Sequence, residues 1–281
     1  MYLARIELTN FKNYESVTLD FSPGFNCFVG NNGVGKTNIL DAVHYLSLTK
    51  SFFNNSDTLS IRHGEDYFIL KGIFEKEGGQ DELFCAFQKQ KQKVFRLNGK
   101  EYPRMSDHVG RYPVVMLSPA DSILISGGSE ERRRFLNKMI SQYDPVYLDA
   151  HMRYNKALMQ RNSVIREGGP DTGSMLEIYD GQMAPAAAVI HQARQSLVEN
   201  LIPLFSSYYA KISGSAEKVS IRYRSHLSSG DYLDQLASSR GRDFAMQHTT
   251  TGIHRDDLIF EIDGHPARTT ASQGQQKSFV V

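Results

Sequence analysis

The sequence has few of the residues on which small secreted or metal-stapled folds depend. Its 281 residues include only 2 cysteines, Cys27 and Cys85, and no tryptophan. Two cysteines are too few for a disulfide framework or a cysteine-rich metal site. The N-terminus shows no apolar signal core, and no stretch approaches the roughly 18–20 apolar residues that a membrane span needs. We therefore expect a protein without a membrane segment that works in the cytoplasm.

An excess of charge of either sign is also absent. The 32 lysines and arginines nearly balance 31 acidic residues, which leaves a net charge of +1. No global basic field therefore indicates a nucleic-acid partner, and any anionic ligand has to be bound by a local site. A composition of 40% hydrophobic and 22% charged residues is globular and excludes a disordered chain. The length allows one or two domains with their own cores.

The hydrophobic pattern divides the chain into three parts. Residues 1–118 carry mainly strand patterns, among them the apolar runs at 25–29 and 114–117, and Asn98-Gly99 predicts a hairpin turn. Residues 119–211 carry helical periodicity, and residues 212–281 return to strand patterns. The alternating Lys89, Lys91 and Lys93 are expected to protect a strand edge.

The helical part predicts an antiparallel hairpin. One helix starts at Ser129, and Asp144-Pro145 has the form of a cap followed by a proline at a second helix start. Gly168-Gly169-Pro170 should end that helix. The return helix has a near-heptad apolar seam, with expected kinks at Pro185 and Pro203. The seam consists of Leu176, Tyr179, Met183, Ala186, Ile190, Ala193, Leu197, Leu201, Leu204 and Tyr208.

The motif with the clearest chemistry follows the run at 25–29. It matches the phosphate-binding P-loop pattern and reads Gly30, Asn31, Asn32, Gly33, Val34, Gly35, Lys36, Thr37. Glycines let backbone amides curl around phosphate oxygens. Lys36 would reach the β- and γ-phosphates, and the Thr37 hydroxyl would bind Mg²⁺. The helix expected from Lys36 directs its positive end at the same anion. We expect this site to bind a nucleoside triphosphate, rather than to be a glycine-rich turn beside a surface lysine.

A second motif lies near the end of the sequence, in the order Ser272, Gln273, Gly274, Gln275. By itself it is typical of a capped helix start, which combines a hydroxyl, a glycine amide and the positive end of a helix. Together with a P-loop in one chain, it resembles the signature motif of ABC-type ATPases.

Longer tracts resemble one branch of that group. The resemblance to the RecF family, bacterial recombination-repair ATPases of the SMC-like branch, runs from residue 3 to the last residue. It rests on residues 8–14, 30–42, 117–119, 131–136, 153–158, 251–258 and 272–275. It implies an α/β fold: an ABC-type (SMC-like) P-loop ATPase head, formed by 1–118 and 212–281, with an inserted antiparallel helical arm at 119–211.

The resemblance also implies a function. A member of this family binds ATP and Mg²⁺ and is a weak, DNA-stimulated ATPase. It forms an ATP-dependent homodimer in which the signature motif of one copy meets the P-loop of the other. It would bind gapped DNA at single-strand/double-strand junctions, work with RecR and RecO, help to load recombinase, and serve replication and the SOS response to DNA damage. Lys12 and Asn13 would lie near the nucleotide, as the corresponding stretch does in SMC-like heads.

Two departures from the family pattern are visible. The junction at 117–121 has no glutamine, so no residue is assigned to the glutamine loop. No apolar run followed by Asp and a catalytic acid occurs, and the family's Walker B strand follows the signature helix. We therefore expect a C-terminally incomplete chain, lacking on the order of 60 residues or more. Such a chain would hydrolyse ATP poorly, and no catalytic residue is assigned to it.

The basic residues give a softer signal. Arg132, Arg133, Arg134 and Lys138 are the candidates for DNA contacts, with others along the arm at Arg153, Lys156, Arg161 and Arg166. A solvated helix surface is the competing interpretation for each of them. For the tract 254–257, which contains histidine, arginine and two aspartates, we expect a structural or interface role.

Two other functions are compatible with these motifs. A nucleotide-binding subunit of a transporter would also combine a P-loop with a signature motif, although the helical arm and the wide separation of the motifs disfavour it. A P-loop kinase acting on a small substrate would use Lys36 but leave Ser272 idle.

Overall fold

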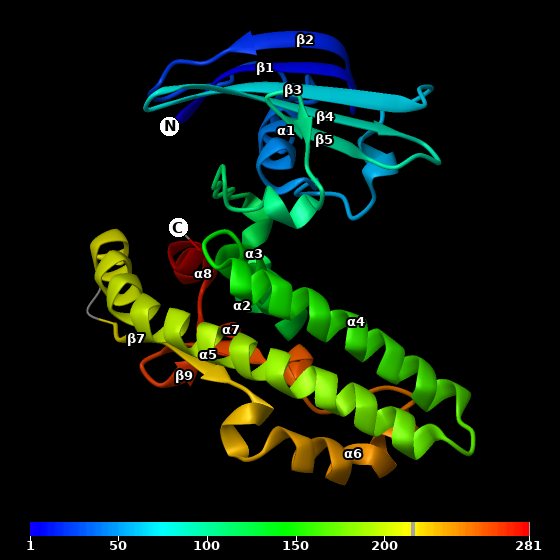
Figure 1. Ribbon diagram of the computed structural model, residues 1–281. Helices are drawn as coiled ribbons and strands as arrows, with labels where there is room; N and C mark the ends of the chain where they lie inside the picture. The colour runs from blue at the N-terminus through cyan, green and yellow to red at the C-terminus, as the bar shows by residue number, and fades with distance from the viewer. Residues whose placement is uncertain (215–216, 281) are drawn as a thin grey trace. The chain divides into compact units, whose positions relative to one another are not determined.

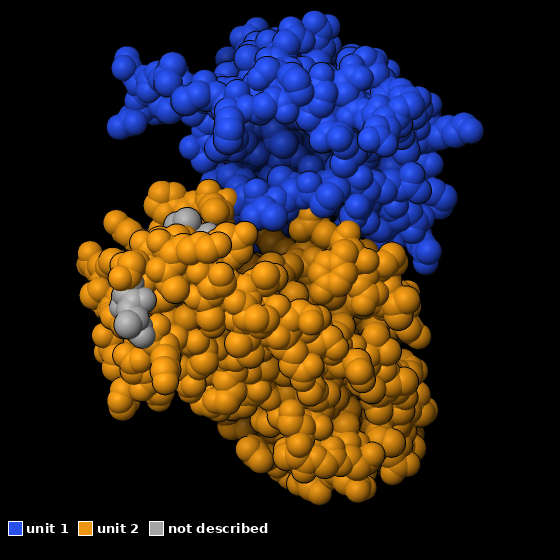
Figure 2. Space-filling model, turned by 90° about the vertical axis from the view of Figure 1, so that its left-hand side faces the viewer, with its two compact units in different colours: residues 1–116 blue, residues 117–281 orange. Residues whose placement is uncertain are grey.

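A computed structural model describes residues 1–214 and 217–280 (Figure 1). The chain forms two compact units, Met1–Met116 and Leu117–Val281, coloured separately in Figure 2. The border between them lies close to the predicted one at residue 118. The predicted arm at 119–211 and the residues that follow it belong to the same unit. The predicted division of the chain into three parts stays a prediction.

The first unit is an antiparallel sheet with a helix on one face (Figure 1). Its strand order is β2-β1-β3-β4-β5-β6. The burial pattern of β3 alternates, because side chains point to opposite faces along a strand and only one face packs on α1. The elements of this unit are β1 (Tyr2–Phe11), β2 (Tyr14–Asp20), α1 (Lys36–Leu48), η1 (Asp57–Ser60), β3 (Tyr67–Lys76), β4 (Gly79–Gln88), β5 (Val94–Leu97), β6 (Lys100–Glu101) and η2 (Met105–Asp107).

The hairpin predicted at Asn98-Gly99 is confirmed. Both residues have positive φ, 50° and 79°, between the paired residues Leu97 and Lys100. Two positive φ values in a two-residue loop are the geometry that matches the twist of the flanking strands.

The prediction for the nearby lysines is wrong. Lys89 and Lys91 lie in the turn between β4 and β5. The ammonium of Lys93 is largely buried, where it donates to Thr49 O at 2.6 Å and Asp57 Oδ2 at 2.9 Å. Lys93 therefore ties the end of α1 to η1 and does not protect a strand edge.

The apolar runs at 25–29 and 114–117 are not strands in the structure. Phe25 and Val115 are among the most exposed apolar side chains of the described residues. A strand forms only where a neighbour completes its ladder of hydrogen bonds, and other segments occupy both sheets of the described chain. The strand predictions for these two runs are therefore wrong.

The second unit is built on a helical hairpin, as predicted. Helix α4 begins after Asp144, whose Oδ1 accepts a hydrogen bond from the Tyr147 amide at 2.9 Å, and it ends at Gly168. Helix α5 returns along α4, and the antiparallel sheet β7-β8-β9 packs on it (Figure 1). The elements are η3 (Pro119–Ser122), α2 (Ile123–Ser126), α3 (Ser129–Ser141), α4 (Pro145–Glu167), α5 (Thr172–Ser213), β7 (Val219–Arg224), η4 (His226–Ser229), α6 (Tyr232–Met246), η5 (Ile253–Arg255), β8 (Asp257–Ile262), β9 (His265–Pro266), α7 (Ala267–Thr270) and α8 (Gln273–Val280).

The apolar seam of α5 is confirmed only in its first part. Leu176, Met183 and Ile190 are buried, whereas Leu204 and Tyr208 are 58% and 61% exposed. Beyond Leu201 the buried face rotates to Phe205 and Tyr209, because this end of the helix packs on β7, β8 and α8 instead of α4. The helix continues through both prolines, Pro185 and Pro203, and the kinks expected there stay a prediction.

A buried histidine makes the first unit sensitive to acid. His108 is fully buried, with Nε2 2.7 Å from Leu46 O and Nδ1 3.1 Å from the Tyr102 hydroxyl. Burial lowers the pKa of His108 to about 4. The unfolded histidine takes up its proton near pH 6.5, so this contribution to stability is complete above that pH and is lost as the pH falls towards 4.

We expect the free energy of unfolding to fall by about 2 kcal/mol between pH 7.5 and pH 5 through this group alone. Urea unfolding of the wild type and of His108→Phe at both pH values measures this fall in the free energy of unfolding. The variant does not titrate at this position, so its loss of stability should be smaller by that amount. An equal loss in both proteins would contradict the prediction.

Candidate functional site

The phosphate-loop motif lies between β2 and α1. Gly33 and Gly35 have φ values of 84° and 104°, in the region that favours glycine. Helix α1 begins at Lys36, with Gly35 as its N-cap. The predicted arrangement of a glycine loop leading directly into a helix N-terminus is therefore confirmed, although the strand expected before the loop is missing.

The side chain of Lys36 folds back across this loop. Its Nζ donates to Gly30 O at 2.7 Å and to Asn31 O at 2.8 Å. This places a cation at the loop's opening, where phosphate oxygens could replace the two carbonyls as acceptors. A Cβ added to Gly33 would meet no atom within 4 Å, so the loop is open on that side. Thr37 is exposed one residue further along. A lysine ammonium, backbone amides, a hydroxyl and open space together fit the phosphates of a nucleotide.

The turn between β1 and β2 contacts the back of the loop. Asn13 Nδ2 donates to Val34 O at 3.2 Å, and the Tyr14 hydroxyl donates to the same oxygen at 3.3 Å. Asn38 Nδ2, from the first turn of α1, donates to Asn13 Oδ1 at 2.7 Å. The sequence predicts Asn13 near this site but does not identify Tyr14 and Asn38. Asn38 directly follows the Lys-Thr of the motif, and Tyr14 directly follows Asn13. Their hydrogen-bond partners, however, lie 25 and 20 positions away in the sequence.

Lys12 is placed differently from Asn13. Its Nζ forms a largely buried ion pair with Asp41 Oδ2 at 2.6 Å, and it lies over the Phe53 ring. Asp41 also accepts from the Ser51 hydroxyl at 2.7 Å and the Phe52 amide at 2.6 Å. The Lys12 ammonium is therefore engaged with α1 and the residues that follow it, and anchors the turn that holds Asn13.

The second motif forms a capped helix start. Ser272 Oγ accepts from the Gln275 amide at 3.3 Å, and Gln275 Oε1 accepts from the Ser272 amide at 2.7 Å. This reciprocal pair is a capping box at the start of α8. Gln275 Nε2 also donates to Glu217 Oε1 at 2.8 Å. Ser272, Gln273 and Gly274 are exposed. Their predicted role, contact with the nucleotide bound by a second copy of the chain, stays a prediction.

The structure corrects part of the basic cluster on α3. Arg132 is buried: its Nε donates to Asp257 Oδ1 at 2.6 Å, and its Nη1 donates to two backbone carbonyls. The prediction that Arg132 contacts DNA is therefore wrong, because its donors are withdrawn from solvent and occupied. Arg161 on α4 is likewise fully buried, between Asp180 and Asp243.

The neighbouring basic residues remain accessible to different degrees. Arg133 is half-buried, and its Nη1 donates to Asp256 O at 2.8 Å. Burial lowers the pKa of Arg133. Arg134 is exposed and paired with Glu130 and Glu131, and Lys138 is partly exposed. DNA contacts by these three residues stay a prediction.

The tract 254–257 has the structural role that we expected. Asp256 Oδ2 accepts from Arg194 Nη1 at 2.6 Å, and Asp257 pairs with Arg132. His254 Nδ1 lies 2.7 Å from the Tyr154 hydroxyl, and burial lowers the pKa of His254 to about 4. These contacts join η5 and β8 to α3, α4 and α5, so the charged groups stabilise the second unit.

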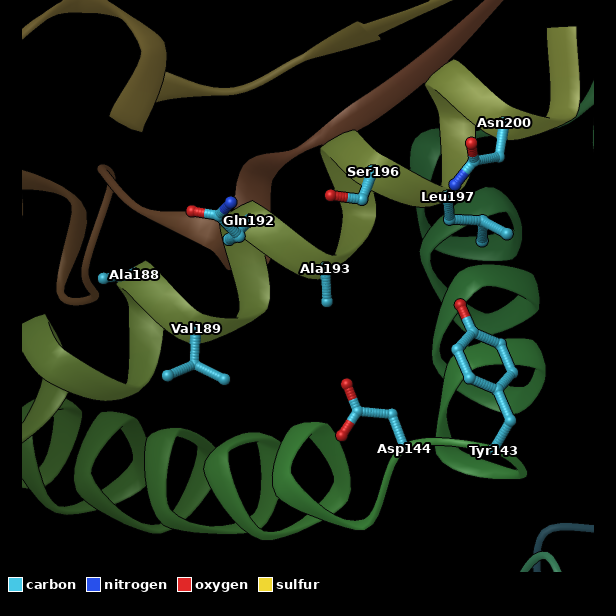
Figure 3. A pocket seen from close by; sticks show the side chains of 9 residues that line it. All are labelled: Tyr143, Asp144, Ala188, Val189, Gln192, Ala193, Ser196, Leu197 and Asn200. Carbon is cyan, nitrogen blue, oxygen red and sulfur yellow. The ribbon is translucent and has the colours of Figure 1, made fainter.

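A separate pocket opens in the second unit (Figure 3). Its volume is about 720 Å³, and it lies between α5 and the turn from α3 to α4. In Figure 3, Val189, Ala193 and Leu197 point from α5 towards the space beside Asp144 and Tyr143. The lining consists of Tyr143, Asp144, Ala188, Val189, Gln192, Ala193, Ser196, Leu197 and Asn200. Neither phosphate-loop nor signature residues line it.

The described part of the chain has neither a cluster of metal-ligating side chains nor a helix suited to span a membrane. Residues 1–214 and 217–280 contain no group of three or more His, Cys, Asp or Glu side chains placed to hold a metal ion. No helix in these ranges combines the length and the apolar character that crossing a membrane requires.

Comparison with known proteins agrees with the site. A family model described as an AAA ATPase domain matches residues 1–163. Proteins named "DNA replication and repair protein RecF" from Phocaeicola vulgatus and Flavobacterium johnsoniae are 45% and 41% identical to this chain. Both alignments cover 100% of this chain, and they cover 76% and 79% of those proteins.

Solved structures give the same result for the fold. "Structure of the recombination mediator protein RecF-ATP in RecFOR pathway" matches with a TM-score of 0.92 at 29% identity, covering 99% of this chain and 78% of that one. An SMC head domain from Pyrococcus furiosus matches with a TM-score of 0.52 at 18% identity, covering 99% and 78% of the two chains. The chain therefore has the fold expected from its sequence, an ABC-type (SMC-like) P-loop ATPase head with a helical arm.

Proposed function

The chain belongs to the RecF family of DNA replication and repair proteins, and from this premise we propose that it couples ATP binding to DNA binding during repair. The observation that carries the proposal is the phosphate loop, in which Lys36 closes over Gly30 and Asn31 at the N-terminus of α1. A solved relative described as RecF-ATP, with a TM-score of 0.92, supports ATP as the nucleotide.

In this proposal the loop binds the triphosphate. Amides of residues 33–36 and the Lys36 ammonium bind the phosphates, and Thr37 contributes a hydroxyl to Mg²⁺. Bound Mg²⁺ would neutralise charge on the phosphate oxygens. A complete member of this family would be a weak, DNA-stimulated ATPase, and we propose that this chain, to which no catalytic residue is assigned, hydrolyses ATP poorly.

The proposal includes an ATP-dependent homodimer. Ser272, Gln273, Gly274 and Gln275 of one copy would meet the nucleotide held by the other, and the exposure of the first three residues supports this role. The Ser272 hydroxyl and the N-terminus of α8 offer hydrogen-bond donors and a positive helix end to a phosphate.

The DNA partner in this proposal is a gapped duplex in the cytoplasm, bound with RecR and RecO to help load recombinase. On α3, Arg133, Arg134 and Lys138 are the residues left to contact phosphates, since Arg132 is buried. With a net charge of +1, binding has to use such a local stripe, and its strength should fall steeply with salt.

Binding of a gapped DNA with and without ATP tests the proposal. We expect ATP to raise the affinity of the wild type by about tenfold or more, because a dimer brings two basic stripes to one DNA. Ser272→Ala should still bind ATP but lose this gain, and light scattering should show no ATP-induced dimer. Gln276→Ala, a change one turn into α8, is the control and should behave like the wild type.

Two results would argue for the alternatives. ATP binding with no DNA affinity at any salt concentration would favour a transporter subunit. Full phosphoryl transfer to a small substrate by Ser272→Ala would favour a kinase. The relatives at 41–45% identity are named as replication and repair proteins, so the sequence comparison supports neither alternative.

A further inference from the structure

A small hydrogen-bonded group holds the back of the phosphate loop. It consists of Asn13 from the turn between β1 and β2, Tyr14 at the start of β2, and Asn38 from α1. Asn13 and Tyr14 both donate to Val34 O, at 3.2 and 3.3 Å. Asn38 donates to Asn13 Oδ1, which leaves the Asn13 amide nitrogen to face the loop. We call this group the clasp.

The clasp fixes the direction of one peptide unit. In a planar trans peptide the carbonyl oxygen and the following N–H point in opposite directions. The two donors that hold Val34 O therefore turn the Gly35 N–H away from Asn13 and Tyr14. Without such partners this peptide could rotate, because glycine at position 35 restrains the backbone little.

The packing behind Gly35 shows how close the clasp lies. A Cβ at Gly35 would come within 2.6 Å of both terminal atoms of the Asn13 amide and within 2.8 Å of the Tyr14 hydroxyl. The third glycine of the motif is thus required by the clasp as well as by its φ of 104°.

The turn that carries the clasp is itself anchored. Lys12 is joined to Asp41 by the largely buried ion pair at 2.6 Å, and its amide donates to Ser60 O at 2.8 Å. Asp41 belongs to α1, the same helix whose first turn carries Lys36. The turn is therefore attached to α1 by a buried contact, and the clasp joins the phosphate loop to this turn.

We propose that Asn13 and Tyr14 are positioning residues that hold the phosphate loop in its ligand-binding shape before the nucleotide arrives. They act on the phosphates through Val34 and Gly35 and do not touch the nucleoside. The inference rests on the proposed function, because it takes ATP as the ligand. Loops held in their bound shape bind more tightly, since less conformational entropy is lost on binding.

The test compares ATP with inorganic tripolyphosphate, each with Mg²⁺, by isothermal titration calorimetry. Tyr14→Phe removes one hydrogen bond and keeps the ring, and we expect it to weaken both ligands about fivefold. Asn13→Ala with Tyr14→Phe should weaken both about twenty-five-fold, with the melting temperature of the ligand-free protein unchanged. Tyr67→Phe, at an exposed tyrosine of β3, is the matched control and should change neither affinity.

The outcomes separate the possible roles. Equal losses for ATP and tripolyphosphate support the clasp. A loss for ATP alone would show that Asn13 or Tyr14 contacts the nucleoside directly and would overturn the proposal, as would unchanged affinities for both ligands. A lowered melting temperature of Tyr14→Phe without ligand would show a general structural role instead. Failure of the wild type to bind ATP or tripolyphosphate would count against the proposed function itself.

Discussion

Replacing Lys36 by alanine should weaken ATP binding by about 100-fold. In the structure the Lys36 ammonium is held over the loop by Gly30 O and Asn31 O, at 2.7 and 2.8 Å. Its replacement removes the only side-chain cation of the loop, which spans residues 30–37. Hydrogen bonds to charged groups contribute about 1.5–3 kcal/mol each, and two orders of magnitude correspond to about 2.7 kcal/mol. Titration calorimetry with ATP and Mg²⁺ measures the change.

A matched control for this variant is Lys100→Ala, because Lys100 is an exposed lysine of the same unit, on β6. It should leave the affinity for ATP unchanged. If Lys36→Ala bound ATP within threefold of the wild type, the loop would not be the phosphate site, and the proposed function would lose its main support.

Replacing Arg194 by methionine should lower the free energy of unfolding by about 3–5 kcal/mol. Arg194 is 1% exposed and pairs with Asp256 Oδ2 at 2.6 Å, and Asp256 is completely buried. Its other donors reach Ile253 O at 2.9 Å and Asn137 Oδ1 at 2.9 Å. Methionine fills similar space but leaves the Asp256 carboxylate without its cation in the interior, which is the costly step. Urea unfolding followed by circular dichroism at 222 nm, which reports on helices, measures the loss.

An exposed pair on the same arm provides the comparison. Arg153 and Asp149 lie 2.9 Å apart on α4, and both side chains are more than half exposed. Arg153→Met should change the stability by less than about 1 kcal/mol, because water screens and solvates both charges. Equal effects of the two substitutions would show that the Arg194 network does not stabilise the second unit.

The sequence predicts helix boundaries well where the signals are local. Asp144 caps α4, Gly168 ends it, and α3 begins at Ser129, each as expected. Caps and glycine stops act through hydrogen bonds and backbone angles within one turn, so neighbouring residues suffice to specify them. The hairpin at Asn98-Gly99 is local in the same sense.

Strands were less predictable, because a strand depends on a partner. The run at 25–29 and the run at 114–117 are as apolar as β5, yet only β5 has neighbours that complete its ladder. Similarly, the heptad seam predicted which side of α5 packs on α4, but could not show that β7, β8 and α8 contact a different side after Leu201.

For the functional site, the sequence alone determined the phosphate loop, because all of its chemistry lies in eight consecutive residues, 30–37. Tertiary structure decided which residues support the loop and which charges serve the fold. Val34 is held by Asn13 and Tyr14, which are 21 and 20 positions away. Arg132 is buried, whereas Arg134, two positions along the same helix, is exposed. The partner of Arg132 is Asp257, which is 125 positions away and reaches Arg132 only in the folded chain. A charge in the interior needs such a partner, and spacing along the chain does not reveal which one it has.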